Sequence, residues 1–151
     1  MKNTLKISAA VFGTLFFIAA TAFTGGDKGG KSKFLEGKKY PVQFYEMKTS
    51  GRGKAMPSEI QIKGGKILCN LTEDKINCGP ASYKITLDST YTEDENEMHM
   101  VSFEATFSDE KMDYKWEGTV INYDIDGTIV QSKAGTEKKR MEFSGSEKTK
   151  K

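Results

Sequence analysis

Two consecutive stretches in the middle of the chain alternate between apolar and polar residues, and this period of two limits the fold more than any other feature. Residues 99–107 read HMVSFEATF, and residues 112–120 read MDYKWEGTV. Successive side chains of a β-strand point to opposite faces, so each stretch buries one face and leaves the other in water. This is the pattern of paired antiparallel strands. The polar residues 108–111 between the two stretches predict a short turn.

Shorter copies of the same alternation fill the rest of the body. They lie at residues 40–44, 60–62, 67–71, 83–87, 125–129 and 141–143. Gly64 and Gly65 predict a two-residue hairpin turn, because glycine readily takes the positive φ that such a turn needs. Outside the N-terminus, no window of about a dozen residues shows a helical stripe. The sequence therefore predicts an all-β fold: a single antiparallel meander β-barrel of about eight strands, whose closure removes exposed edges.

The N-terminus has the layout of a secretory signal peptide. Lys2 and Lys6 form a positive head, residues 7–20 are mostly apolar, and Ala20-Thr21-Ala22 is a small-x-small cleavage signal. The alternative is an uncleaved anchor, since residues 7–26 are twenty residues without a charge. With cleavage after residue 22, the protein is exported to the periplasm or the extracellular space. The mature form is then expected to be soluble and not membrane-spanning.

The remainder of the 151-residue chain has room for one domain. Residues 23–33 are rich in glycine and lysine and predict a flexible leader. Residues 34–145 hold all of the alternating stretches and are assigned to the β-barrel domain. Residues 146–151 form a basic polar tail.

Cys69 and Cys78 are the two cysteines of the chain. An oxidising compartment lets such a pair form a disulfide, and the residues between them form a loop of hairpin size. Free thiols, or thiols bound to a metal, are the alternative. A metal site of this kind needs four ligands, and no histidine lies near the pair to complete the set.

Four short motifs give the chain a likeness to a known group. They are FEA at 103–105, WEGTV at 116–120, IDGTIV at 125–130 and FSG at 143–145, and residues 58–66 add a strand-turn opening. In this order the motifs resemble those of small exported bacterial lipocalin-like (calycin-type) β-barrel proteins. The resemblance covers most of the mature chain and implies an eight-stranded meander barrel. It brings no catalytic motif to this sequence.

The phase of the alternation points a set of aromatic residues into the barrel. They are Tyr40, Phe44, Tyr83, Phe103, Phe107, Tyr114, Trp116 and Phe143. One interpretation is an aromatic-lined cup that binds a small apolar or amphipathic ligand at the barrel mouth. The other is an ordinary core, because the inward side chains of a small barrel can fill it.

His99 shares the inward phase and begins its strand beside an acidic turn, so it joins the candidate binding residues as a histidine at the rim. A general base is the alternative, but spacing ties no serine or cysteine nucleophile to it. The segment DIDG at 124–127 lacks the remaining ligands of a calcium loop. We therefore predict no catalytic site, no metal site and no cofactor, and we do not expect an enzyme.

Charge is unevenly distributed along the chain, although the formal net charge is only +2, which does not suit a nucleic-acid partner. Residues 85–126 hold twelve acids against Lys111 and Lys115. The basic charges of the terminal strands are expected to pool and to attract anionic surfaces, unless these positions are merely solvated. Two functions follow as hypotheses. The first is an exported lipocalin-like protein that binds a small lipophilic ligand; the second is an interaction module with a filled barrel that contacts an envelope component or another protein.

Overall fold

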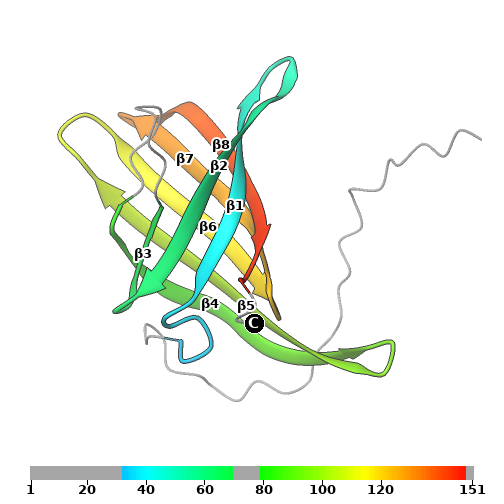
Figure 1. Cartoon of the computed structure of the whole chain (residues 1–151). Coiled ribbons are helices and arrows are strands. Elements are labelled where there is room, and N and C mark those ends of the chain that lie inside the picture. Colours follow the sequence, from blue (N-terminus) through cyan, green and yellow to red (C-terminus); the bar gives the residue numbers. More distant parts are fainter. Residues whose placement is uncertain (1–31, 70–78, 149–151) are drawn as a thin grey trace, which may run out of the picture.

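The structure is a computed structural model, and it describes residues 32–69 and 79–148. These residues form eight strands around a single barrel (Figure 1). The strands are β1 (Lys39–Lys48), β2 (Gly51–Lys63), β3 (Lys66–Cys69), β4 (Ala81–Glu93), β5 (Asn96–Ser108), β6 (Asp113–Ile121), β7 (Asp124–Lys133) and β8 (Thr136–Ser146).

Each strand pairs antiparallel with the next one along the chain, and β8 pairs with β1 to close the ring. Closure brings Val42 opposite Gly145 and Phe44 opposite Phe143. The predicted all-β meander barrel of eight strands is confirmed. Among the described residues, no helix is long and apolar enough to cross a membrane.

The alternation of the sequence is reproduced as alternating burial. In β6, Tyr114, Trp116 and Val120 are buried, whereas Lys115 and Glu117 between them are exposed. The buried side chains of all the strands form one hydrophobic cluster inside the barrel. The turns also follow the sequence, since Gly64 and Gly65 both have positive φ between β2 and β3.

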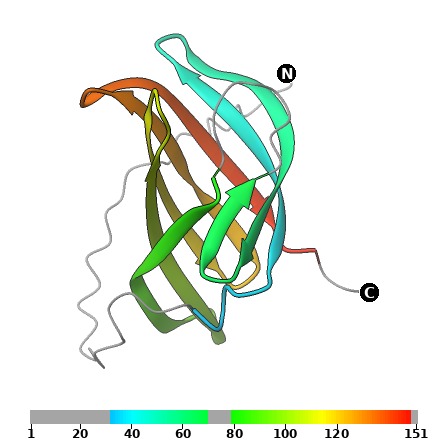
Figure 2. The same ribbon diagram turned by 90° about the vertical axis from the view of Figure 1, so that its left-hand side faces the viewer.

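Two hairpins extend further than the alternation predicted. The strand β2 begins at Gly51, well before the predicted stretch at 60–62, and its first half forms a hairpin with β1 at one end of the barrel. At the opposite end, β4 continues to Glu93 and β5 begins at Asn96. The β4–β5 hairpin projects beyond the neighbouring strands (Figures 1 and 2). Its turn consists of Asp94 and Glu95, both with positive φ.

The segment from Ser32 to Lys38 closes the end of the barrel at which β1 begins. Leu35 is fully buried in the core cluster, and Gly37 N–H donates to the Ile62 carbonyl at 2.8 Å. The Glu36 carboxylate accepts hydrogen bonds from the N–H groups of Gly64 and Gly65. Ser32 is itself buried, although it falls in the predicted leader. At the other terminus, β8 runs to Ser146, the first residue of the predicted tail.

Few residue pairs connect β3 to β4 in the barrel. The strand β3 is four residues long, and it pairs with β4 only through Lys66↔Ser82 and Ile67↔Ala81. One further hydrogen bond runs from Tyr83 N–H to the Gly65 carbonyl. Beyond Tyr83, β4 is paired with β5 on one side only within the described ranges 32–69 and 79–148.

Candidate functional site

Seven of the eight aromatic residues that were predicted to face inward are buried inside the barrel. Tyr40, Phe44, Tyr83, Phe103, Tyr114, Trp116 and Phe143 are all buried in the core cluster. Phe107 is partly buried and lies parallel to Tyr114, with the ring centroids 4.6 Å apart. The inward phase assigned from the sequence is therefore correct for these residues.

Several of the interior rings pack against one another. Phe143 contacts both Phe44 and Trp116, with centroid separations of 5.5 and 5.7 Å. Tyr83 meets Phe103 edge to face at 6.2 Å, and the Phe103 ring lies directly over Gly118, where an added Cβ would come within 2.5 Å of it. These contacts are those of a packed aromatic core.

Besides Ser32 Oγ in the closing segment, three buried polar atoms inside the barrel have no hydrogen-bond partner among the described residues. They are Tyr40 Oη, Ser58 Oγ and Trp116 Nε1. Burial raises the pKa of the Tyr40 phenol, with a smaller contribution from the negative charge of Glu147. Buried polar atoms nearly always bond to protein or to an ordered molecule, so these three atoms are the part of the interior that could bind a polar group.

His99 lies at the rim of the closed end, as predicted. Its Nε2 is 2.6 Å from Asp88 Oδ1, and its ring packs against the Phe34 ring in a tilted arrangement with centroids 4.2 Å apart. Its backbone N–H and carbonyl both bond to Asn122, each at 2.9 Å. Lys38 Nζ lies 4.0 Å from the Phe34 centroid and 3.0 Å from Glu147 Oε2. His99 thus helps to attach the closing segment to the β4–β5 hairpin, which is a structural role.

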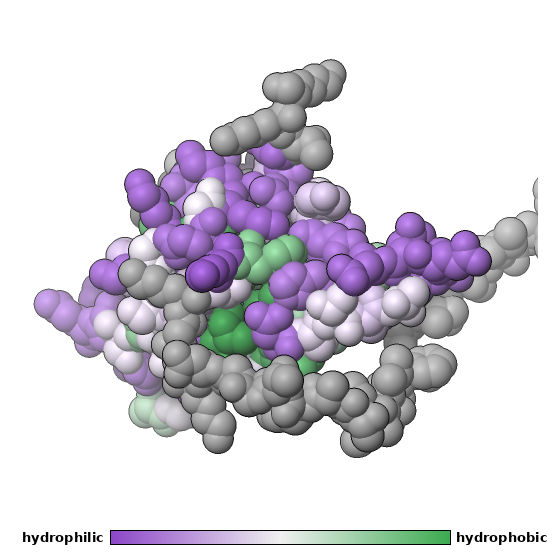
Figure 3. Space-filling model, turned by 90° about the horizontal axis from the view of Figure 1, so that it is seen from below, coloured by the Kyte–Doolittle hydropathy of each residue, from purple (hydrophilic) through white to green (hydrophobic). Residues whose placement is uncertain are grey.

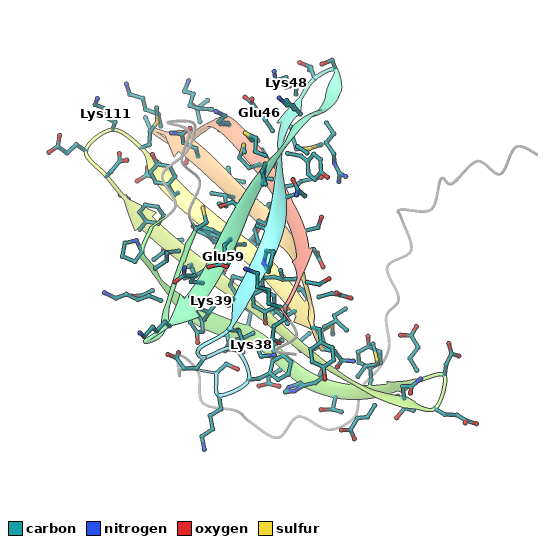
Figure 4. The ribbon with its side chains drawn as sticks, viewed as in Figure 1. Lys38, Lys39, Glu46, Lys48, Glu59 and Lys111 are labelled. Carbon is teal, nitrogen blue, oxygen red and sulfur yellow. The ribbon has the colours of Figure 1, made fainter. Side chains whose placement is uncertain are left out.

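Polar groups line the opposite end of the barrel. Glu46 Oε1 lies 3.7 Å from Lys139 Nζ, and Glu46 Oε2 lies 4.0 Å from Lys48 Nζ. Figure 4 shows Glu46 and Lys48 on the upper part of β1, with Lys111 at the turn between β5 and β6. The Tyr114 hydroxyl donates to an Asp109 carboxylate oxygen at 2.9 Å.

A polar groove of about 440 Å³ lies on the outer face of β5, β6 and β7. Its lining includes Ser102, Glu104, Glu117, Thr119 and Asp126. A hydrogen bond from Lys84 lowers the pKa of Glu104, whereas desolvation by neighbouring protein atoms raises the pKa of Asp126. These side chains point away from the aromatic interior, so this groove is not the predicted cup.

Apolar side chains lie on the outer face of the projecting hairpin, beside the polar Ser89. The register pairs Tyr91 with Met98 and Met100 with Ile121, and Leu87 lies beside them on the same face. Leu87 is 39% exposed and the others are half-buried. We call this set the hairpin patch: Leu87, Tyr91, Met98, Met100 and Ile121. From the closed end, a small apolar area is visible among hydrophilic side chains (Figure 3).

Glutamates neutralise several of the basic charges that were expected to pool on the terminal strands. Ion pairs join Lys38 to Glu147, Lys148 to Glu59, Arg52 to Glu142 and Lys139 to Glu46. Lys38 and Glu59 lie on the lower part of the β1–β2 face in Figure 4. The acids of the β4–β5 hairpin differ, because Asp88, Glu93, Asp94, Glu95 and Glu97 have no lysine or arginine partner within the described residues. Negative charge is therefore concentrated at one projecting element.

Cys69 ends β3 opposite Ile60, and Cys78 lies outside the described residues. The disulfide between them stays a prediction. Within the described ranges, no group of three histidine, cysteine or carboxylate side chains is placed to hold a metal ion.

Sequence reasoning missed the hairpin patch and the closing segment. Both depend on contacts between segments that a local sequence pattern does not predict, although the acidic run at 93–97 lies at the tip of the hairpin. Comparison with family models, with curated proteins and with solved structures finds no match for this chain.

Proposed function

We propose that this protein is an interaction module that contacts an envelope component or another protein through its outer surface. One observation supports this most: exposed and half-buried apolar side chains gather on the projecting hairpin and beside it. Leu87 and Tyr123 are the two large apolar residues that are exposed in the described part of the chain. Leu87 is on the hairpin, and Tyr123 is in the adjacent β6–β7 turn.

Apolar residues on a projecting hairpin add little to the stability of the fold unless another molecule covers them. The hairpin patch faces away from the barrel, so it adds nothing to the core that stabilises the fold. Contiguous apolar patches rimmed by polar residues mark interaction sites on proteins. Methionine and tyrosine suit such a site, since methionine adapts its shape and tyrosine offers both an apolar ring and a hydroxyl.

The experiment measures sedimentation of the purified mature protein with envelope fractions of its own source. A double variant, Tyr91→Ser with Met98→Ser, removes the centre of the hairpin patch. The matched control is Tyr45→Ser with Met47→Ser, which removes the same residue types from β1, where both are also half-buried. We expect the hairpin variant to lose binding and the control to retain it, with unchanged thermal melting of both. Equal binding by the two variants would contradict the proposal.

A second candidate function has its own support. The unpartnered Tyr40 Oη, Ser58 Oγ and Trp116 Nε1 favour a small amphipathic ligand inside the barrel, which is the lipocalin-like hypothesis. Native mass spectrometry of protein purified from its own compartment tests this by the mass of a retained molecule. Ligand binding inside the barrel should also change the fluorescence of Trp116, the single tryptophan.

Export is part of both proposals. The charged head, the apolar run and the small-x-small site support cleavage after residue 22 and a periplasmic or extracellular location. Intact-mass measurement of the exported protein tests it, and a mature form that retains Met1 would exclude cleavage. The likeness to lipocalin-like proteins supports the barrel as a scaffold, and neither proposal includes an enzymatic activity.

A further inference from the structure

The β4–β5 hairpin has one unpaired backbone edge. The strand β4 runs to Glu93, but β3 ends its pairing with β4 at Ser82, and the last hydrogen bond across this junction involves Tyr83. From Lys84 onward, the only strand that pairs with β4 among the described residues is β5. Unpaired strand edges present rows of N–H and carbonyl groups that can accept another strand.

The register shows which groups point outward from this edge. Asp94 and Glu95 form a two-residue turn, so Glu93 and Asn96 exchange hydrogen bonds, and the bonded pairs then recur at every second residue. Thr90 and His99 form a non-bonded pair. This agrees with the bonds of the His99 backbone, which both go to Asn122 on the opposite side. The N–H and carbonyl groups of Asp88, Thr90 and Thr92 therefore point to the free edge.

The two faces beside this edge differ in character. Leu87 and Tyr91 lie on the outer face with the rest of the hairpin patch, whereas Asp88, Thr90 and Thr92 lie on the other face, as does Glu97 opposite Thr92. A strand added at the edge would place its alternate side chains against these two faces in turn. It would need apolar residues on the outer face and residues complementary to carboxylates on the other.

Charge restricts the occupant further. Residues 85–110 contain eight acids and no lysine or arginine. A second copy of β4 at this edge would bring like charges together, which opposes pairing. A basic segment would instead neutralise carboxylates that have no basic partner in the described structure apart from the His99 contact of Asp88.

We infer that the free edge of β4 binds an extended, basic segment of another protein, in which lysine or arginine alternates with apolar residues, by β-strand addition. The inference rests on the proposed function, because the apolar side chains of the segment would cover the hairpin patch.

The test uses the mature protein and a synthetic peptide of alternating lysine and valine, long enough to run from Leu87 to Glu93. Amide signals of the isotope-labelled protein report the binding site, and titration gives the affinity. We expect shifted signals and slower hydrogen exchange at Asp88, Thr90 and Thr92. Replacing lysine by glutamate in the peptide should abolish binding. N-methylation of every second peptide amide, on the bonding side, should weaken binding about tenfold or more.

The matched protein variants are Thr90→Pro and Thr90→Ala. Both remove the side chain, but only proline removes the outward N–H, and proline is tolerated at strand edges. We expect Thr90→Pro to weaken binding about tenfold or more and Thr90→Ala to bind like the original protein. Strand addition would be overturned if Thr90→Pro bound the peptide as tightly as the original protein does, and if the N-methylated peptide bound as tightly as the unmodified one. A loss of peptide binding in the Tyr91→Ser, Met98→Ser variant would still support the hairpin patch as a binding surface. No binding of the basic peptide would overturn the inference and leave the envelope experiment to decide the proposed function.

Discussion

Trp116→Ala is expected to remove a large part of the stability of the barrel. Trp116 is the largest fully buried side chain, and it lies mid-strand between Ala105 and Ile129 on the neighbouring strands. Truncating a buried tryptophan to alanine typically costs about 3–5 kcal/mol, because burial is lost and a cavity remains. The ring contact with Phe143 adds to this loss. A domain of this kind has about 5–15 kcal/mol in total, so the variant should be barely folded.

Urea unfolding followed by far-ultraviolet circular dichroism is the suitable assay, since the variant has no tryptophan to report by fluorescence. With a slope of about 2 kcal/mol per molar urea, the midpoint should fall by about 2 M. Trp116→Phe is the matched control. It keeps a ring in the core and removes an N–H that has no bond to lose, so its midpoint should fall much less.

The original protein should show the blue-shifted emission of a buried indole. A red-shifted emission, together with a fall in midpoint below about 0.5 M for Trp116→Ala, would refute the inward packing of this side chain. The interior aromatic core as described would then be wrong.

Three further predictions follow from the core, the glycines and the cysteines. Burial raises the pKa of Tyr40 above its usual value of 10.0, so the free energy of unfolding should fall as the pH rises through that value, because only the unfolded chain then releases the proton. In urea unfolding measured up to about pH 11, Tyr40→Phe should make this fall smaller, and it should not reduce the stability at neutral pH. Gly127→Ala should lower the melting temperature more than Gly118→Ala, because a Cβ at Gly127 would overlap backbone atoms of β6, whereas the three atoms nearest to a Cβ at Gly118 all belong to the Phe103 side chain. Thermal melting of both variants ranks them, and an equal loss would contradict this prediction. Reduction of the predicted Cys69–Cys78 disulfide should cost about 2–3 kcal/mol, and non-reducing peptide mapping that finds two free thiols would exclude the bond.

The sequence predicted those parts of the fold in which burial alternates. His99 to Phe107 and Met112 to Val120 face the core on one side, so their period of two is visible without any tertiary information. The same reasoning placed Trp116 and Phe143 inside. Gly64 and Gly65 were readable as a turn because their positive φ is a local requirement.

The hairpin extensions were not predictable in this way. Residues 51–55 of β2 and 87–98 of the β4–β5 hairpin extend past the hydrophobic core, so the core does not select an alternating pattern there. Phe34 and Leu35 are two apolar residues in an otherwise polar segment, too short to show a period, and only the closed barrel shows that Leu35 covers one end. Whether the aromatic interior is filled or hollow is also a property of packing between strands, which periodicity does not encode.

The pairing of β1 with β8 has a consequence for how the chain reaches its structure. Val42 meets Gly145, so residues near opposite ends of the domain must find each other before the ring closes. The entropy of closing so long a loop is lost before the contacts form, and folds rich in such distant contacts fold slowly. Every earlier strand can pair with its predecessor as it becomes available, but β1 keeps an open edge until the final strand arrives. The rate-limiting step of folding is therefore expected to be the arrival of residues 136–146, the last segment of the barrel to be synthesised.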